Sequence, residues 1–196
     1  MRRETFKERE RRRREEEILT EAGRLIREHG MTALNMDTLA ELVGISKPTL
    51  YQHFKSKEEL TARILIGGIE QLEHYLLTTT QNSPMERLTN VLRMLLENRY
   101  KSNGLLAGVS HELILTTVHT HEGVLKSKAR VRTILDEVVE EGKRRGEIEA
   151  SLPTPMVSCM VFNLMGLPAA AEMQDDIDAA VPYVVKIFTR AVQRNP

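Results

Sequence analysis

The chain has 196 residues, and its 28 lysines and arginines balance 28 aspartates and glutamates. With 41% hydrophobic residues, the composition is globular and excludes a disordered or fibrous chain. Cys159 is the single cysteine, so no intramolecular disulfide can form, and no apolar signal-peptide core follows the basic N-terminus. The longest weakly polar stretch, 156–171, is too short to span a bilayer. We therefore expect a cytoplasmic protein with no membrane span.

Charge is unevenly distributed along the chain despite the overall balance. Residues 1–14 hold eight basic and three acidic side chains, a net charge of +5. Residues 136–149 hold three basic and six acidic side chains, a net charge of −3. The N-terminal end is thus suited to a polyanion, although a solvated tail without a partner is the alternative.

Helices are expected along most of the chain, because apolar residues recur at spacings of three and four and the runs end at glycine or proline. A first helix is predicted over residues 9–28, before Gly30. Asn35 caps a short second helix that ends at Gly44, and Ser46 caps a third. The first 54 residues therefore contain three predicted helices.

The rest of the chain is also predicted to be helical. Ser56 and Ser83 each begin a capping-box pattern at the start of a helix. The first of these helices contains Gly67-Gly68, which is expected to bend it or to let it pack closely. Residues 114–120 are rich in β-branched side chains, as a strand would be, but no second strand candidate is present, so helix is favoured. Further helices are expected at 125–145, at 154–173 with Thr154 as its cap, and at 178–193.

The most informative segment comprises the two short helices within residues 35–54. A small residue, Ala40, lies four positions before Gly44, as a close crossing of two helices requires. Leu50 and Phe54 are expected to face the core. The outward side of the second helix can then reach phosphates and base edges in a major groove, through Lys47, Thr49, Tyr51, Gln52 and His53. A helical corner inside a bundle, without DNA, is the alternative.

Residues 44–60, GISKPTLYQHFKSKEEL, resemble the signature of the TetR family of bacterial transcriptional regulators, and residues 30–40 resemble the segment ahead of it. The resemblance implies an all-α homodimer with an N-terminal three-helix helix-turn-helix DNA-binding domain and a larger C-terminal helical domain that binds an effector and dimerises. We accordingly expect a basic N-terminal extension over 1–14, the DNA-binding domain over 15–62, and the effector-binding and dimerisation domain over 63–196.

The function implied by the resemblance is sequence-specific regulation of transcription. The family usually represses, and it releases a palindromic double-stranded DNA operator when a small-molecule effector binds. A ligand-independent or activating regulator is the alternative within DNA binding.

The resemblance also implies roles for individual residues. Tyr51 and His53 correspond to the family's usual phosphate contacts, and Lys57 to a phosphate contact at the start of the next helix. Asn35 stands where the family often has Thr or Ser, and Pro48 where it commonly has a small residue. The expected DNA-binding residues are Asn35, Ser46, Lys47, Thr49, Tyr51, Gln52, His53 and Lys57. Arg11 to Arg14 either extend this footprint or form a solvated helix end.

The C-terminal two-thirds carries no recognisable motif. The helices at about 154–173 and 178–193 are the most apolar, and each needs more cover than one subunit offers, so we expect them to form the homodimer interface. Burial of both helices in the core of a single subunit is the alternative. An effector would bind in a mostly apolar cavity after Gly67. Candidate effector-binding residues are the polar ones on apolar faces: His74, Tyr75, Tyr100, His111, Thr117 and Asn163.

A second class of function, a helical metal-binding protein or enzyme, would depend on the cluster His111, Glu112, His119, His121 and Glu122. Its spacing is poor, because His119 and His121 lie about 200° apart on a helix and no histidine lies four residues after His111. No phosphate-binding loop, nucleophile elbow or paired-carboxylate pattern is present. We therefore expect no metal, no cofactor and no enzymatic activity.

Overall fold

The computed structural model describes residues 5–30, 33–101, 116–117, 120–170, 172–173 and 175–194. These residues form helices and no strand, and Ile148 and Gln193 make an isolated antiparallel bridge. The helices are α1 (Phe6–His29), α2 (Met36–Val43), α3 (Lys47–His53), α4 (Lys57–Thr78), α5 (Pro84–Tyr100), α7 (Glu122–Arg144), α8 (Thr154–Asn163), the 3-10 turn η2 (Leu164–Gly166), α9 (Leu167–Ala170) and α10 (Ile177–Val192). The expected all-α fold class is confirmed.

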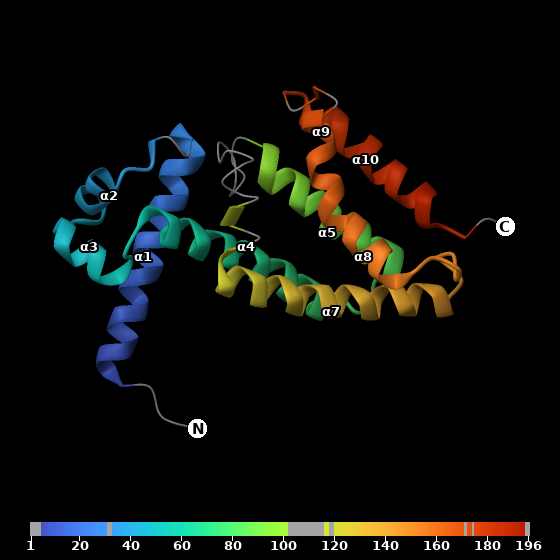
Figure 1. The fold of residues 1–196 in the computed structure, drawn as a ribbon, viewed down its shortest axis with the longest axis horizontal. Coiled ribbons are helices and arrows are strands. Elements are labelled where there is room, and N and C mark those ends of the chain that lie inside the picture. The colour runs from blue at the N-terminus through green and yellow to red at the C-terminus, as the bar shows by residue number, and fades with distance from the viewer. Residues whose placement is uncertain are drawn as a thin grey trace.

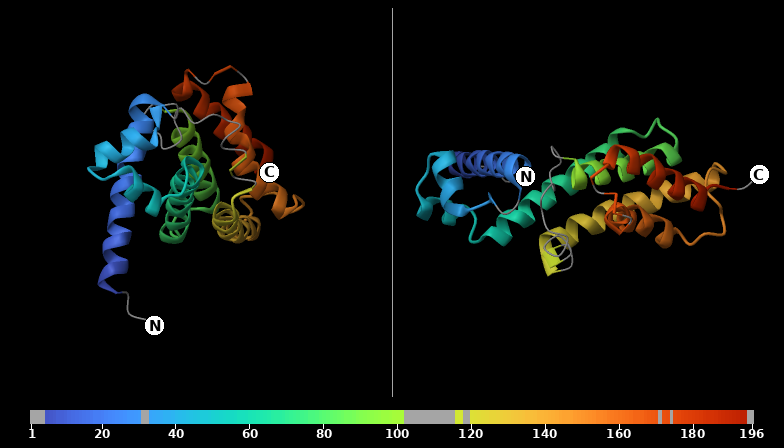
Figure 2. Two further views of the ribbon diagram at one scale, coloured as in Figure 1. Left: turned by 60° about the vertical axis from the view of Figure 1, so that its left-hand side comes forward. Right: turned by 90° about the horizontal axis from the view of Figure 1, so that it is seen from above.

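The molecule has two unequal ends joined by α4. Figure 1 shows α1, α2 and α3 gathered at one end and α5, α7, α8 and α10 at the other, with α4 running between them. The views in Figure 2 show the same arrangement, with α7 packed along α4. Each end has its own cluster of buried apolar residues.

The smaller core lies among α1, α2, α3 and the first turns of α4. Its fully buried side chains include Ile18 and Ile26 of α1, Leu39 of α2 and Leu50 of α3. Ile64 of α4, 5% exposed, also belongs to this core. The smaller core therefore includes the first two turns of α4, as far as Ile64.

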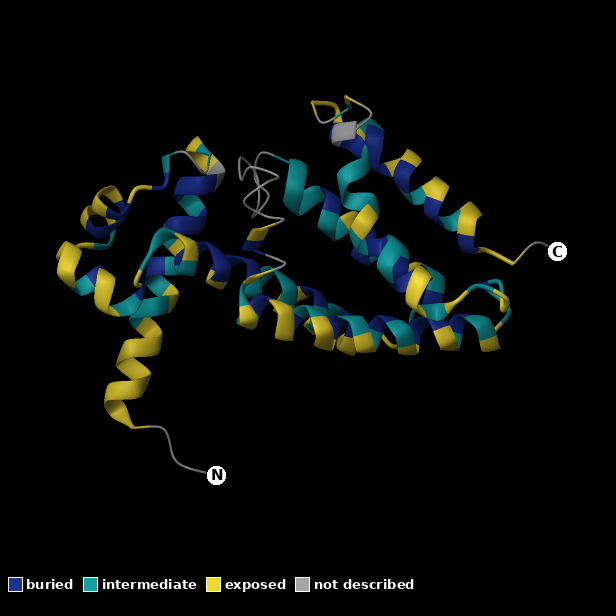
Figure 3. Cartoon of the chain, in the orientation of Figure 1, coloured by how far each residue is buried: buried dark blue, intermediate teal, exposed yellow. Residues whose placement is uncertain are grey.

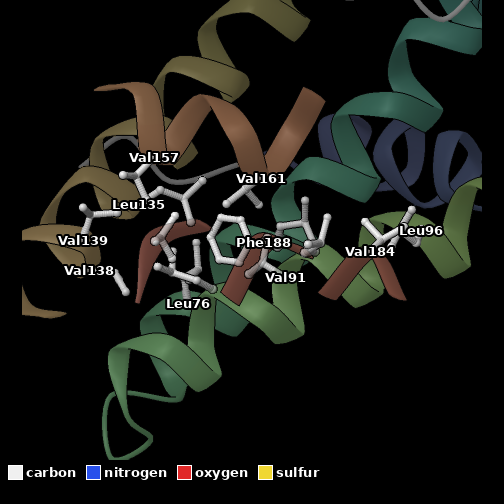
Figure 4. Packing of buried hydrophobic residues seen from close by; sticks show 14 of the residues in the cluster. Leu76, Val91, Leu96, Leu135, Val138, Val139, Val157, Val161, Val184 and Phe188 are labelled. Atoms are coloured by element: carbon white, nitrogen blue, oxygen red, sulfur yellow. The ribbon is translucent and has the colours of Figure 1, made fainter. Parts of the chain in front are cut away.

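The larger core fills the space between α4, α5, α7, α8 and α10. Figure 4 shows Phe188 of α10 among apolar side chains that include Val91 of α5 and Val161 of α8. Arg87 of α5 is 5% exposed, and its Nη2 donates a hydrogen bond of 2.7 Å to the carbonyl of Leu76 in the last turns of α4. This bond ties the far end of α4 into the larger core.

Helix α1 begins earlier than predicted and includes most of the basic segment. Thr5 and Glu8 form a capping box that starts the helix one turn before the predicted residue 9. Arginines on the first turns pair with glutamates one turn further along: Arg11 with Glu15, Arg12 with Glu16, Arg13 with Glu17 and Arg14 with Glu17. Figure 3 shows this part of α1 exposed as it extends beyond the small core. Residues 6–14 are thus the start of α1.

The start of α4 differs in one respect from a capping box. Ser56 accepts a hydrogen bond from the backbone of Glu59, as predicted, but the Glu59 carboxylate accepts from the backbone of Lys55 instead of Ser56. The helix then continues without a break through Gly67-Gly68. A Cβ placed on Gly67 would meet no atom within 4 Å, so close packing does not require a glycine at that position.

One of the two predicted C-terminal helices is divided in the structure. The predicted helix 154–173 is wrong as a single unit, because α8 ends at Asn163 and a 3-10 turn and the short α9 follow. Pro168, which lacks an N–H, lies in this broken region. Thr154 is the first residue of α8 and its side chain makes no capping bond, so its predicted cap is also wrong. Helix α10 matches its prediction closely, with Asp176 as cap.

The middle of the chain is described only in part. Within the predicted helix 114–120, Thr116, Thr117 and Thr120 are helical, and the other positions lie outside the described residues. The following helix, α7, ends just before Gly146, whose φ of +73° stops it as predicted. None of the described helices is both long enough and apolar enough to cross a membrane.

Candidate nucleic-acid interface

Helices α2 and α3 form a tightly capped pair. The side chain of Asn35 accepts a 2.8 Å hydrogen bond from the backbone of Asp37, which confirms it as the cap of α2. Gly44 ends α2 at a φ of +71°, a left-handed conformation in which a glycine avoids strain. Ser46 caps α3 by accepting from the backbone of Thr49, and the two hydroxyls lie 2.7 Å apart. These local bonds fix the turn between the two helices.

The pair is anchored to the small core by two apolar side chains. Leu50 is fully buried and Phe54 is 1% exposed, although Phe54 follows α3 as its C-terminal cap and is not part of the helix. With these residues inward, Lys47, Tyr51 and Gln52 are exposed, and Thr49 is half-buried. The outward side of α3 is therefore polar, and it lies on the surface at the end of the molecule (Figure 3).

Lys47 is exposed but bound to a neighbouring carboxylate. Its Nζ lies 2.7 Å from Oδ1 and 3.0 Å from Oδ2 of Asp37, in the first turn of α2. Hydrogen bonding to Asp37, reinforced by Coulomb attraction, raises the pKa of the Lys47 ammonium above its usual value. Lys47 is therefore a cation in a defined position.

His53 was predicted to project into solvent, but the structure places it differently. Its side chain is only 14% exposed, and Nδ1 lies 3.5 Å from Oε1 of Glu15 on α1. Glu15 also accepts a 2.9 Å hydrogen bond from Arg11. Because His53 ends α3 on the side that faces α1, packing brings it against this helix. The carboxylates of Asp37 and Glu15 were not found from the sequence, since neither is adjacent to its partner in the chain.

Ser46 and Lys57 lie at helix starts, as expected from the sequence. Ser46 is the exposed cap of α3, and Lys57 is the half-buried first residue of α4. Together with Asn35 they place three helix N-termini near one end of the molecule, where backbone N–H groups favour anions. Their contact with DNA stays a prediction.

The predicted effector residues that the structure describes differ in exposure. His74 and Asn163 are exposed, so neither lines an enclosed cavity. Tyr75 accepts a hydrogen bond from Asn90, and Tyr100 donates one to the carbonyl of Met165. Thr117 is buried and His111 lies outside the described residues. Asn163 borders a surface groove of about 280 Å³ between α7 and α8.

The predicted metal-ligand cluster falls mostly outside the described residues, which include neither His111, Glu112 nor His119. His121 instead caps α7, where its Nδ1 accepts a 3.4 Å hydrogen bond from the backbone of Val124. In the part of the chain that the structure describes, no three histidine, cysteine or acidic side chains are placed to hold a metal ion.

Taken together, the capped pair, its buried anchors and its polar outward face define a helix-turn-helix DNA-binding protein. Comparison with known proteins agrees. Residues 18–64 match the family model described as bacterial regulatory proteins, tetR family. An uncharacterized HTH-type transcriptional regulator from Mycobacterium tuberculosis, Rv1556, is 29% identical over 174 residues, which cover 88% of this chain and 86% of the relative.

Solved structures have the same fold. The ketosteroid transcriptional regulator KstR2 of Mycobacterium tuberculosis superposes with a TM-score of 0.61 at 18% identity, over 93% of this chain and 96% of that one. The fatty acid degradation regulator FadR from Bacillus halodurans superposes with a TM-score of 0.65 at 20% identity, over 89% and 94% of the two chains. Residues 18–64 therefore form a DNA-binding domain of the TetR family, within a chain whose overall fold is that of solved transcriptional regulators.

Proposed function

We propose that the protein is a transcriptional repressor that binds a palindromic operator as a homodimer and releases it when a small apolar effector binds to the C-terminal end. The observation that carries this proposal is the outward polar face of α3 on a domain of the TetR family. A recognition helix of seven residues reads only a short half-site, so a dimer gains affinity by reading two.

The proposed DNA contacts follow from how each side chain is placed. Tyr51 and Gln52 are exposed on α3 and carry a hydroxyl and an amide that can reach phosphates or base edges. Asn35, Ser46 and Lys57 lie at helix starts, where they bind phosphate. The hydroxyl of Thr49 is hydrogen-bonded to that of Ser46. His53 lies beside Glu15, so its contact with DNA requires that its side chain stay accessible there.

The proposed dimer interface is the outer face of α8 and α10. Met156 of α8 is 65% exposed, and Tyr183 and Ile187 of α10 are 59% and 50% exposed. The two helices contact each other in the larger end of the molecule (Figure 1). Apolar surface of this kind is expected to be covered by a second copy in a four-helix arrangement.

The proposed effector is an apolar molecule with one polar end. One structural neighbour is described as a ketosteroid transcriptional regulator and another as a fatty acid degradation regulator. The larger core of this chain consists almost entirely of aliphatic side chains. Tyr75, Tyr100 and Thr117 are the buried or half-buried polar groups from the predicted set. Tyr75 and Tyr100 pack against this core, and a ligand that entered it would meet their hydroxyls.

The operator is the first experimental test. Selection from a pool of random duplexes should enrich a palindrome whose half-site centres lie about 10 base pairs, or a multiple of that, apart. Selection that enriches no sequence would contradict sequence-specific binding. Placing the selected duplex ahead of a reporter then separates a repressor, which lowers transcription, from an activator, which raises it.

The dimer and the effector need separate experiments. Tyr183→Glu with Ile187→Glu should yield monomers by light scattering, whereas Leu77→Glu, at an exposed apolar position on α4, should not.

For the effector, operator affinity is measured with and without a long-chain fatty acid or a ketosteroid. Release by either one supports the proposed effector class, and Tyr100→Phe should weaken that release. No response to either would contradict it.

A further inference from the structure

The side chain that begins the recognition helix is held by a carboxylate from the preceding helix. The ammonium of Lys47 contacts both carboxylate oxygens of Asp37, at 2.7 Å and 3.0 Å, across ten residues of sequence. The start of α3 is itself fixed by Ser46, which accepts from the backbone of Thr49. The ammonium therefore occupies a defined place on the outward face of the helix-turn-helix.

Folding alone does not explain this pair. The side chains of Lys47 and Asp37 are 55% and 53% exposed, and exposed ion pairs contribute little to stability. A carboxylate in the first turn of α2 also favours the helix dipole, but that role needs no lysine. Beside a DNA backbone, moreover, the negative charge of Asp37 opposes binding to every sequence.

The geometry instead favours a role in choosing what Lys47 contacts. An ammonium group has three donor hydrogens, so Lys47 can bind Asp37 and still donate to another acceptor. Guanine presents O6 and N7 in the major groove, a pair that lysine commonly recognises, and recognition helices place their first residues at base edges. A lysine held in place loses less freedom on binding there and is less available to neighbouring phosphates.

We propose that Asp37 is a positioning residue that directs Lys47 to a guanine edge of the operator and away from the phosphate backbone. The inference rests on the proposed reading of DNA by α3. Asp37 then has two effects: it increases the preference for the operator sequence, and it lowers the affinity for DNA of any sequence.

The test compares Asp37→Asn with the wild-type dimer on the selected operator, on operators with each base pair changed in turn, and on a scrambled duplex. Removing the carboxylate should raise affinity for the scrambled duplex by about 3-fold to 10-fold and make its salt dependence steeper by about one phosphate contact. Preference for guanine at one operator position should fall by about 5-fold or more. Asp37→Glu should retain much of that preference.

Glu41→Gln is the matched control, because it removes one exposed negative charge from the same helix, and Glu41 makes no ion pair with a described residue. Lys47→Gln should lose preference at the same operator position, and adding Asp37→Asn to it should cause no further loss. The Lys47→Gln result also tests the proposal if Asp37→Asn proves unstable.

Three results would overturn the inference: Asp37→Asn behaving like Glu41→Gln, lower affinity of Asp37→Asn for the scrambled duplex, or an unchanged base preference in Lys47→Gln. The failure of the proposed function looks different. In that case the wild-type protein itself would not distinguish the selected operator from the scrambled duplex, and Tyr51→Ala would bind both duplexes as the wild type does.

Discussion

The two ends of the molecule have different surfaces over similar apolar cores. At the α1–α3 end, the outward-facing helix surfaces are polar and carry ion pairs such as Lys47–Asp37 and Arg11–Glu15. At the other end, α8 and α10 leave large apolar side chains exposed, including Met156 and Tyr183. The first surface suits a hydrated, charged partner and the second a protein surface. This difference supports the proposed assignment of DNA to the first surface and of a second copy of the chain to the second.

The largest expected effect separates the two cores. Phe54→Ala should cost the DNA-binding end about 3–5 kcal/mol, because it empties a fully buried site in a small core. DNA binding should be lost while the dimer persists, as measured by urea unfolding and light scattering. Phe188→Ala, in the larger core, should instead disrupt the dimer. Loss of the dimer in Phe54→Ala would show that the two ends do not unfold independently.

The next effect tests how α4 is held at its far end. Arg87→Met should lower the free energy of unfolding by about 1–3 kcal/mol, because the Leu76 carbonyl and the Glu141 carboxylate both lose a donor. Arg93→Met, at an exposed position of the same helix, should change stability by about 0.5 kcal/mol or less. Equal effects of the two variants on the free energy of unfolding in urea would contradict a stabilising role for the buried Arg87.

Two neighbouring side chains of α3 are expected to have different roles at the DNA-binding surface. Tyr51→Ala should weaken binding to all sequences alike, because its expected contact is a phosphate. Gln52→Ala should relax preference at one base pair by about 1–3 kcal/mol and leave binding to a scrambled duplex unchanged. Titration of single-substituted operators measures both. If base preference survives Gln52→Ala, direct readout by Gln52 is wrong.

The smallest expected effect concerns the join between the ends. Gly67→Ala should stabilise the protein by about 0.4–1 kcal/mol, because α4 is unbroken and the new Cβ has open space. If the glycine serves as a hinge, the variant should also respond less to the effector in operator release. Unchanged release would discard the hinge hypothesis and leave only the gain in stability.

Local signals explain which features the sequence predicted well. Asn35, Gly44, Ser46 and Ser83 act on backbone atoms within a few residues, so their roles as caps or stops follow from sequence order, and the structure confirms them. Leu50 and Phe54 follow from the spacing of apolar residues in a recognised motif. The same motif gave the family and the fold class.

Features that depend on tertiary packing were not predictable in this way. The contact of His53 with Glu15 joins residues 38 positions apart, and that of Lys47 with Asp37 depends on the crossing of two helices. The end of α8 at Asn163 was missed because the apolar pattern continues beyond it. His74 and Asn163 sit beside apolar residues in sequence, yet both face solvent.

Helix α4 supplies Leu60 and Ile64 to one core and Leu72 and Leu76 to the other within a single unbroken run. A protease therefore finds no loop between the two ends, and a cut within α4 would strip buried side chains from whichever fragment lost them. A shortened chain ending at residue 62 would keep Leu60 but lack Ile64. Anyone wishing to study the DNA-binding end alone should retain more of this helix than a boundary drawn from sequence suggests.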